Sequence, residues 1–462
     1  IILKPAPEDS AAAEAPAQEY ILRLEEIKSV AVKNPEDEFV VVSSAVSEPV
    51  EDSADPRAAD PFIEGFEGYA MSVWDLNRML QIPAELVSRG LVDENPGDLS
   101  LFGLDPPRAE VRVETAGGTA ALYIGNDAPD GSNIYVGKEG FPGVYLADSW
   151  NLGNYLKRAL DFADTAVSPA GTDDGRGSFV FDSIRLGGSV RSGAEITVVK
   201  EDQNPSGDEA SDIMSSPYRI TAPIEARFSM DKGLPVLQGI FGIRASRAVS
   251  KSGGDLDRWG LARPWSTARV NGTMEKGLGG FSVRASAPDS QGNVYLMKEG
   301  SDLVFQAAAA DLPWLSVTWF DLMEKLIVLP FIDTVASVEV RTPERTVEFT
   351  LSGEGDDLKV RAGGVELDPP VFRSYYQTLL TASYDEKTDT SPASLPEAFL
   401  EIVYRYRSGK SPEHIRFYST GSRRVLVNYN GGRVYVTLAA YTDKVIADLD
   451  QVLAGQKVLP YL

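Results

Sequence analysis

The stretch FGLDPPRAEVRV at 102–113 returns as WGLARPWSTARV at 259–270, 157 residues further along the chain. Both copies begin with an aromatic residue and Gly-Leu, continue over two variable residues to a Pro, and end in a strand-like run that closes on Val. A second pair follows in the same order, NIYVGKEGFPGVYL at 133–146 and NVYLMKEGSDLVFQ at 293–306, at an offset of 160 residues. Two matched pairs in one order and at nearly one spacing indicate an internal duplication.

The repeat has a signature whose members we expect to pack alike in each copy. We expect Phe102 and Trp259 to anchor a corner between a helix and the sheet. The glycine that follows each of them supplies a backbone conformation that other residues resist, and the proline sets the start of an edge strand. The signature consists of Phe102, Gly103, Leu104, Pro107 and Tyr135 in the first copy, of Trp259, Gly260, Leu261, Pro264 and Tyr295 in the second, and of Tyr435 in a third, more divergent copy.

Each copy has the same order of elements: two strand-like runs, a helical segment, a meander of short strands and a closing helix. Ser72 and Ser229 stand where helix N-caps are expected. Helical segments are expected at 72–92 and 229–243, and closing helices at 149–160, 318–329 and 442–455. This pattern predicts an α+β fold of tandem repeated modules, each a mainly antiparallel β-meander packed with two short helices.

The length of 462 residues suggests about three domains, at roughly 150 residues for each. Polar and Gly-rich stretches predict the boundaries. We expect a linker at 1–17, the first module at 18–167, a linker at 168–177, the second module at 178–331 and the third module at 332–462.

Composition excludes several classes of function. The chain has 44 Lys+Arg against 68 Asp+Glu and a formal charge of −24, which repels the phosphate backbones of nucleic acids. Because there are no cysteines, disulfide scaffolds, thiolate metal sites and cysteine nucleophiles are all excluded. Ile1, Ile2 and Leu3 are either the trailing edge of a membrane helix or signal segment that is absent from this sequence, or the trimmed start of a soluble protein.

No residue pattern of a known catalytic site stands out, and we expect neither catalytic residues nor a cofactor. The single histidine, His414, begins a strand in the third module, and no G-x-S-x-G elbow or phosphate loop accompanies it. The loop GNDAPDGSN at 125–133 places Asp127, Asp130 and Asn133 at intervals of three. These oxygens make a calcium site conceivable, although Asp-Gly and Asn also form tight hairpin turns unaided.

Aromatic residues offer a second route to a ligand site. Among the six tryptophans, which include Trp74 and Trp150, Trp259 and Trp319 fit core positions. Trp265 stands where the first copy has Arg108. We therefore take Trp265 and Tyr145 as candidate ligand-binding residues, if they prove exposed in a cleft between modules.

The motif FGL-x-x-P, the hairpin GNDAPDGSNIYV and the strand VYL together resemble the bacterial family called domain of unknown function 4340. The resemblance covers roughly residues 20–325 and weakens in the third copy. It implies one N-terminal membrane helix, absent from this sequence, and an extracytoplasmic remainder that is anchored to the cell membrane. Members of the family often accompany ABC-2-type transporters and gliding-motility-type auxiliary proteins. No catalytic residues are implied.

Three functions follow as hypotheses. The leading one is a non-enzymatic, membrane-anchored accessory or scaffold protein of an ABC-2-type export or gliding-motility-like system, whose partners are membrane-embedded transporter or auxiliary subunits. It predicts exposed apolar patches rather than a deep polar pocket. The alternative is a module that binds an envelope ligand, either a glycan or a peptide. The third is a hydrolase with an acidic site of two carboxylates or a Ser-Lys pair.

Overall fold

A computed structural model describes residues 18–43, 60–171, 181–200, 216–251, 254–272, 280–459 and 461. The expected linker at 1–17 and most of the linker at 168–177 lie outside the described residues. The chain divides into two compact units. The first unit is Ile1–Ala166 with Ala245–Gly253 and Leu303–Gln306, and the second unit is the rest. Among the described residues, no helix has the length and apolar character needed to cross a membrane.

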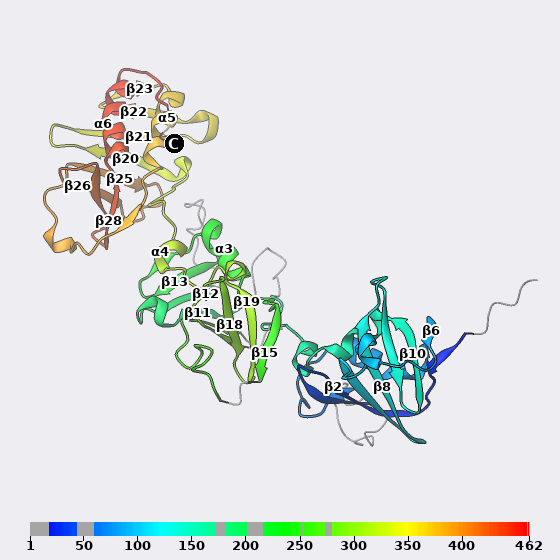
Figure 1. Cartoon of the computed structure of the whole chain (residues 1–462). Helices are drawn as coiled ribbons and strands as arrows, with labels where there is room; N and C mark the ends of the chain where they lie inside the picture. Colours follow the sequence, from blue (N-terminus) through cyan, green and yellow to red (C-terminus); the bar gives the residue numbers. More distant parts are fainter. Residues whose placement is uncertain are drawn as a thin grey trace, which may run out of the picture. The chain divides into compact units, whose positions relative to one another are not determined.

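Three large antiparallel sheets, coloured from blue to red along the chain in Figure 1, form the fold. The first has the order β4 (Phe62–Ile63), β3 (Glu38–Val42), β2 (Ile27–Lys33), β7 (Ala109–Thr115), β8 (Gly118–Asp127), β9 (Asn133–Lys138), β10 (Phe141–Asp148), β6 (Gly90–Asp93). The second has the order β14 (Ala226–Arg227), β13 (Tyr218–Ala222), β12 (Ile196–Lys200), β11 (Ser183–Gly187), β16 (Ser266–Asn271), β17 (Phe281–Ala285), β18 (Asn293–Lys298), β19 (Leu303–Ala308), β15 (Arg247–Lys251). The third has the order β23 (Val365–Leu367), β22 (Lys359–Ala362), β21 (Thr346–Ser352), β20 (Val335–Arg341), β25 (Leu400–Tyr406), β26 (Glu413–Ser419), β27 (Arg424–Tyr429), β28 (Val434–Leu438), β24 (Glu386–Lys387). A small fourth sheet pairs β1 (Tyr20–Leu22) with β5 (Leu86–Val87).

The three large sheets share one path of the chain. A meander runs outward from a central strand to one edge, a helix follows, and a short strand then forms the opposite edge. The chain returns to the centre and meanders outward until it meets that short strand. The helices at the crossover are α1 (Val73–Gln81), α3 (Met230–Gln238) and α5 (Pro369–Leu379). The repeated modules predicted from the sequence are therefore present as a repeated topology.

The core of the first sheet follows from period-two alternation along its strands. Val30 and Val32 on β2, and Val111 and Val113 on β7, are buried, whereas their neighbours along each strand are more exposed. Successive side chains of a strand point to opposite faces, so these valines share one face. In the third sheet, the Tyr375 hydroxyl on α5 donates to Val445 O on α6 (Ala439–Leu453), which joins the two helices that cover the sheet (Figure 1).

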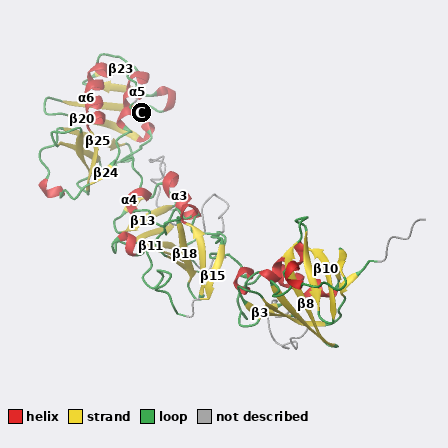
Figure 2. Cartoon of the chain, viewed as in Figure 1, coloured by secondary structure: helices red, strands yellow, loops and turns green. Residues whose placement is uncertain are grey.

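The chain is mainly antiparallel β, with less helix than an α+β fold implies; Figure 2 shows how little of it is helical. The N-caps are confirmed, since Ser72 Oγ accepts from Asp75 N and Ser229 Oγ from Lys232 N. The helix expected at 72–92 ends at Gln81, because a 3₁₀ turn containing Pro83 follows and the remaining residues form β5 and β6.

Two of the three closing helices are also shorter than expected. Only α2 (Ser149–Leu152), followed by a 3₁₀ turn, forms within 149–160, and only α4 (Trp319–Leu322) forms within 318–329. After α4, Glu324 N donates to Arg227 O and Ile327 N donates to Ala382 O. These backbone groups are satisfied by neighbouring segments rather than by a helix. The third closing helix is confirmed as α6 (Ala439–Leu453).

The repeat signature forms the same turn twice. Gly103 and Gly260 both have φ +67°, in the left-handed region that favours glycine. Leu104 N donates to Leu99 O at 3.1 Å, and Leu261 N to Leu256 O at 2.9 Å. The Phe102 ring then meets Tyr135 edge-on at 5.1 Å.

In the second sheet the Trp259 ring meets Tyr295 in the same way, at 4.7 Å. Pro107 and Pro264 precede β7 and β16, which lie in the middle of their sheets, so the expectation that they start edge strands is wrong. Each proline stands two residues before its strand and therefore removes no donor from the ladder.

The placement of Tyr435 also needs correction. Tyr135 and Tyr295 lie on β9 and β18, whose counterpart in the third sheet is β27, whereas Tyr435 lies on β28. By strand order, Tyr435 corresponds to Tyr145 on β10 and to Phe305 on β19. All three side chains are buried. The conserved order of strands shows this match, which residue type alone does not.

A buried cation ties together the second sheet. Arg191 is only 8% exposed and donates to Gly187 O at 2.7 Å, Ser266 Oγ at 3.0 Å and Trp314 O at 2.6 Å. Burial lowers its pKa to about 10, so the guanidinium stays charged at neutral pH. Because neutral oxygens satisfy this charge, the cation acts as a structural link rather than as half of an ion pair.

Candidate functional site

The most exposed tryptophans of the described chain flank one arginine on the first unit. Trp74 on α1 is 60% exposed, and Trp150 on α2 is 72% exposed. The Arg78 guanidinium carbon lies 4.8 Å from the centre of the Trp74 ring and 5.0 Å from that of Trp150. We call Trp74, Arg78 and Trp150 the tryptophan surface. Its rings present flat apolar faces to solvent around a cation, a composition enriched at protein contacts.

Local structure fixes this surface in place. Ser72 caps α1 and places Trp74 in the first turn, with Arg78 one turn later on the same side. The Arg78 guanidinium donates to Asn151 Oδ1 at 3.0 Å, and Asn154 Nδ2 donates to Asp75 Oδ1 at 3.1 Å. Both bonds join α1 to the segment after β10. A hollow of about 430 Å³ adjoins the rings, and Gln81, Ile82, Glu85, Leu86 and Asn151 complete its lining.

The second sheet shows that the fold does not require these residues. Ser72 and Ser229 cap equivalent helices, so Trp74 corresponds to Asp231 and Arg78 to Pro235. The offset of the second repeat block matches Trp150 with Ala310. The same topology forms with an acid, a proline and an alanine at these positions. The tryptophan surface therefore belongs to the first module alone.

The acidic loop forms a hairpin turn rather than an open set of ligands. Asp130 Oδ1 accepts from the backbone N–H groups of Ser132 and Asn133, both at 2.9 Å, and Asp130 Oδ2 accepts from the Asn133 side chain at 2.7 Å. The hydrogen bond from the Asn133 side chain is the largest cause that lowers the pKa of Asp130, to about 2. Asp127 instead pairs with Arg108 at 3.2 Å.

The second sheet repeats this turn with different residues. Asp289 accepts from Gln291 N at 2.8 Å and from Asn293 N at 2.9 Å. An aspartate that accepts from backbone amides of the next residues stabilises a tight turn by itself. Over the described ranges, no group of three or more Asp, Glu or His side chains could hold a metal ion. The hairpin is stabilised by its own hydrogen bonds, and calcium binding there stays a prediction.

The two candidate ligand-binding aromatics differ in exposure. Tyr145 is 5% exposed and packs against Phe141, with ring centres 5.3 Å apart, so its expected exposure in a cleft is wrong. Its side chain belongs to the hydrophobic core of the first sheet. Trp265 is half-buried, and its carbonyl accepts from Val190 N at 3.0 Å. Its role in ligand binding stays a prediction.

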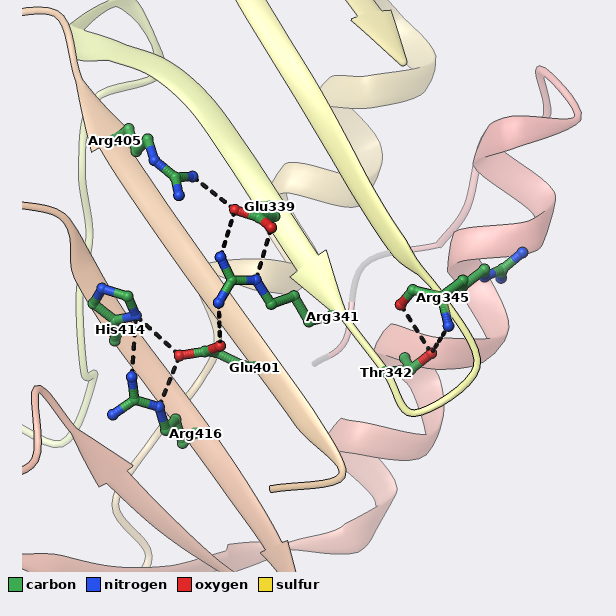
Figure 3. A network of polar contacts seen from close by, with 8 residues as sticks. All are labelled: Glu339, Arg341, Thr342, Arg345, Glu401, Arg405, His414 and Arg416. Carbon is green, nitrogen blue, oxygen red and sulfur yellow. Dashed lines mark hydrogen bonds and ion pairs between the residues drawn. The ribbon is translucent and has the colours of Figure 1, made fainter. Parts of the chain in front are cut away.

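His414 belongs to a network of ion pairs across three strands of the third sheet (Figure 3). Its Nδ1 lies 2.9 Å from Glu401 Oε1, which also accepts from Arg416 Nε at 2.7 Å. Arg341 Nη1 donates to the other Glu401 oxygen at 2.8 Å. Partial burial raises the pKa of Glu401, but the hydrogen bond with His414 and the two guanidinium charges outweigh it, and the net shift is downward.

The other half of this network has the same character. Glu339 accepts from Arg341 Nε at 2.7 Å and from Arg405 Nη1 at 2.8 Å. Figure 3 shows Thr342 and Arg345 apart from it, at the β20–β21 turn. The partners of His414 are a carboxylate and a guanidinium, so the arrangement stabilises the face of the sheet and offers no activated nucleophile.

Sequence reasoning named Trp74 and Trp150 among the tryptophans considered for a ligand site but did not distinguish them, and it missed Arg78. The signal was present in the repeat itself. Where the first copy has Phe102, the second has another aromatic residue, Trp259. In contrast, the residues that correspond to Trp74 and Trp150 in the second copy are Asp231 and Ala310. A large apolar residue that the sister module replaces by a small or charged one is not required by a shared core.

Comparison with known proteins supports the resemblance. The sequence profile of the family described as Domain of unknown function (DUF4340) matches residues 67–176 and 219–397. These two regions together cover more than half of the chain, and they include both signature turns. No curated protein and no solved structure matches the chain significantly.

Proposed function

The chain belongs to the DUF4340 family, and from this premise we propose that it is a non-enzymatic accessory or scaffold protein of an ABC-2-type export or gliding-motility-like system. It is anchored at the cell membrane with its modules on the extracytoplasmic side. The tryptophan surface of the first module contacts a protein subunit of that system. The observation that carries this proposal is the solvent exposure of Trp74 and Trp150 on either side of Arg78.

The chemistry of the surface supports a protein partner. Tryptophan and arginine are among the residues most enriched where truncation costs binding energy. A tryptophan ring buries much area while ordering only two torsions. Arg78 holds both rings by cation–π contacts and by its bond to Asn151, so little entropy is lost on binding. A pre-ordered apolar surface of this kind favours a complementary apolar patch on another protein.

The repeat supports the assignment to the first module. A scaffold built from similar modules distinguishes its contacts by residues in which the modules differ. The replacements Asp231, Pro235 and Ala310 remove both rings and the cation from the equivalent place in the second sheet. The first module thus has a surface that its sister lacks, on an equivalent backbone.

Site-specific photocross-linking in native membranes tests the proposal. A photoreactive residue at position 150 of the full-length protein is expected to capture a transporter or auxiliary subunit, and the same residue at position 310 serves as the matched control. The double substitution Trp74→Asp with Trp150→Ala introduces the residues of the second module and is expected to abolish co-purification. Equal capture from 150 and 310, or undiminished co-purification of the double variant, would overturn the proposal.

A further inference from the structure

A second, unrelated feature is a pocket of about 470 Å³ in the second unit. The scaffold hypothesis does not predict a pocket with polar walls. The apolar wall of the pocket is the 323–330 segment, which runs extended between β14 and the residues around Ala382. Four tyrosines of the third module form much of the remaining wall, namely Tyr384, Tyr406, Tyr429 and Tyr435.

The three carboxylates of the pocket lining already have partners within the protein. Glu413 accepts from Tyr406 at 2.5 Å and from Lys410 at 2.9 Å. Glu225 pairs with Arg219 at 3.1 Å, and Glu324 Oε1 accepts from the backbone amides of the next two residues. Glu225 and Glu413 are thus paired with cations of the protein, and Glu324 is held by backbone amides.

The unused groups of the pocket are hydrogen-bond donors. Tyr435 is 5% exposed, and within the described part of the chain neither its hydroxyl nor that of Tyr384 has a hydrogen-bond partner. The two rings lie 4.2 Å apart, and burial raises the pKa of both phenols, so both are protonated at neutral pH. Phenols that line a pocket and have no partner in the protein can donate to a ligand there.

Arg433 adds a cation beside these phenols. Its charge acts on Tyr435, and its guanidinium lies over the Trp319 ring at 5.1 Å. Across the ranges that the structure describes, Arg433 has no ion pair and no hydrogen bond. Its five N–H donors are therefore available, in a planar arrangement that matches a carboxylate.

We propose that this pocket binds a small organic monocarboxylate, whose carboxylate is held by Arg433 and by the hydroxyl groups of Tyr435 and Tyr384. The body of the ligand lies against the tyrosine rings and the 323–330 segment. One free cation and two free donors match one carboxylate. The body is either a sugar ring, as in a uronic acid, or an aromatic ring. This site is independent of the tryptophan surface.

Titration calorimetry on the full chain tests the proposal with two acids and their neutral counterparts. The probes are glucuronate against glucose, and phenylacetate against phenylacetamide. We expect one of the two acids to bind at a ratio of one to one with a dissociation constant below about 1 mM, and its neutral counterpart not to bind. The acid that binds identifies the body of the ligand. Failure of both acids, or equal binding of an acid and its neutral counterpart, would overturn the proposal.

Variants of the pocket locate the binding. Arg433→Gln is expected to weaken binding at least about tenfold, and Tyr435→Phe about fivefold. Phe305 occupies the equivalent position in the second sheet, so the phenylalanine is compatible with the packing. Arg361→Gln, which removes an exposed cation elsewhere in the third module, serves as the control and should leave binding unchanged. An acid that binds Arg433→Gln and Tyr435→Phe as it binds the unmodified chain contradicts the assignment.

Discussion

The two signature glycines, Gly103 and Gly260, have the same backbone conformation in different surroundings, so the cost of an alanine can be compared between them. Both have φ +67°, so an alanine at either position costs about 1 kcal/mol from the left-handed region alone. A Cβ on Gly103 would also overlap the Asn126 side chain, whereas a Cβ on Gly260 would meet Ser286 Cβ at 3.3 Å. Gly103→Ala should therefore destabilise the protein more than Gly260→Ala does, by about 2 against about 1 kcal/mol.

Chemical denaturation of the two single variants measures this difference. Equal losses of unfolding free energy would mean that Asn126 moves aside without cost. The reverse order would contradict the idea that crowding distinguishes the two turns. In either case the shared conformational penalty remains, because it depends on φ and not on the neighbours.

At the scale of elements, the ion-pair network across β20, β25 and β26 predicts a response to acid. The hydrogen bond from Arg341 is the main cause that lowers the pKa of Glu339, and the pKa of Glu401 is lowered as well. An acid with a folded pKa below its unfolded value stabilises the fold above the unfolded pKa, near 4.3. That contribution is lost as the pH falls through the folded pKa. The third sheet should therefore lose stability below about pH 4.

Glu401→Gln tests this expectation by removing the carboxylate that three side chains share. At pH 7 the variant should be less stable by about 1 kcal/mol, a small loss because the network reaches solvent. At pH 3 the difference from the unmodified protein should shrink. A pH-independent difference between the two proteins would show that Glu401 acts through packing rather than through its charge.

Elements also show where sequence reasoning succeeded and failed. The signature turns and N-caps were predictable because each depends on a few adjacent residues, such as Ser72 with Asp75. The closing helices at 149–160 and 318–329 were overestimated because their apolar spacing fits a helix, while distant partners satisfy the backbone. Glu324 N is bonded to Arg227 O, almost a hundred residues away, and no local pattern contains that information.

The same limit applies to the candidate site. Tyr145 has the residue type of a binding site, but its strand directs the ring to the core. The exposure of Trp74 and Trp150 could have been inferred by comparing the repeats, since the second copy has an aspartate in place of Trp74 and an alanine in place of Trp150. The pocket around Arg433 could not, because its walls come from segments on β14, after α4 and on two hairpins of the third module.

At the scale of the whole molecule, the division into two compact units predicts that the chain does not unfold in one step. Gly103→Ala acts in the first unit, and Arg191→Met acts in the second. The latter removes the donors of buried carbonyl groups, among them Gly187 O and Trp314 O, and should cost about 3 kcal/mol. Differential scanning calorimetry of the intact chain should resolve at least two transitions. Because the two sites share no partners, their effects should be independent and additive.

Each substitution should therefore lower one transition and leave the other in place. For Arg191→Met we expect a shift of roughly 5 °C, because its unit has about 280 residues. The double variant should show both shifts at once. A single transition whose calorimetric and van't Hoff enthalpies agree would contradict the prediction, as would a uniform shift of every transition by either substitution. Separate transitions would mean that the tryptophan surface and the Arg433 pocket lie on parts of the chain that unfold independently. Either site could then be altered by substitution without unfolding the part that carries the other.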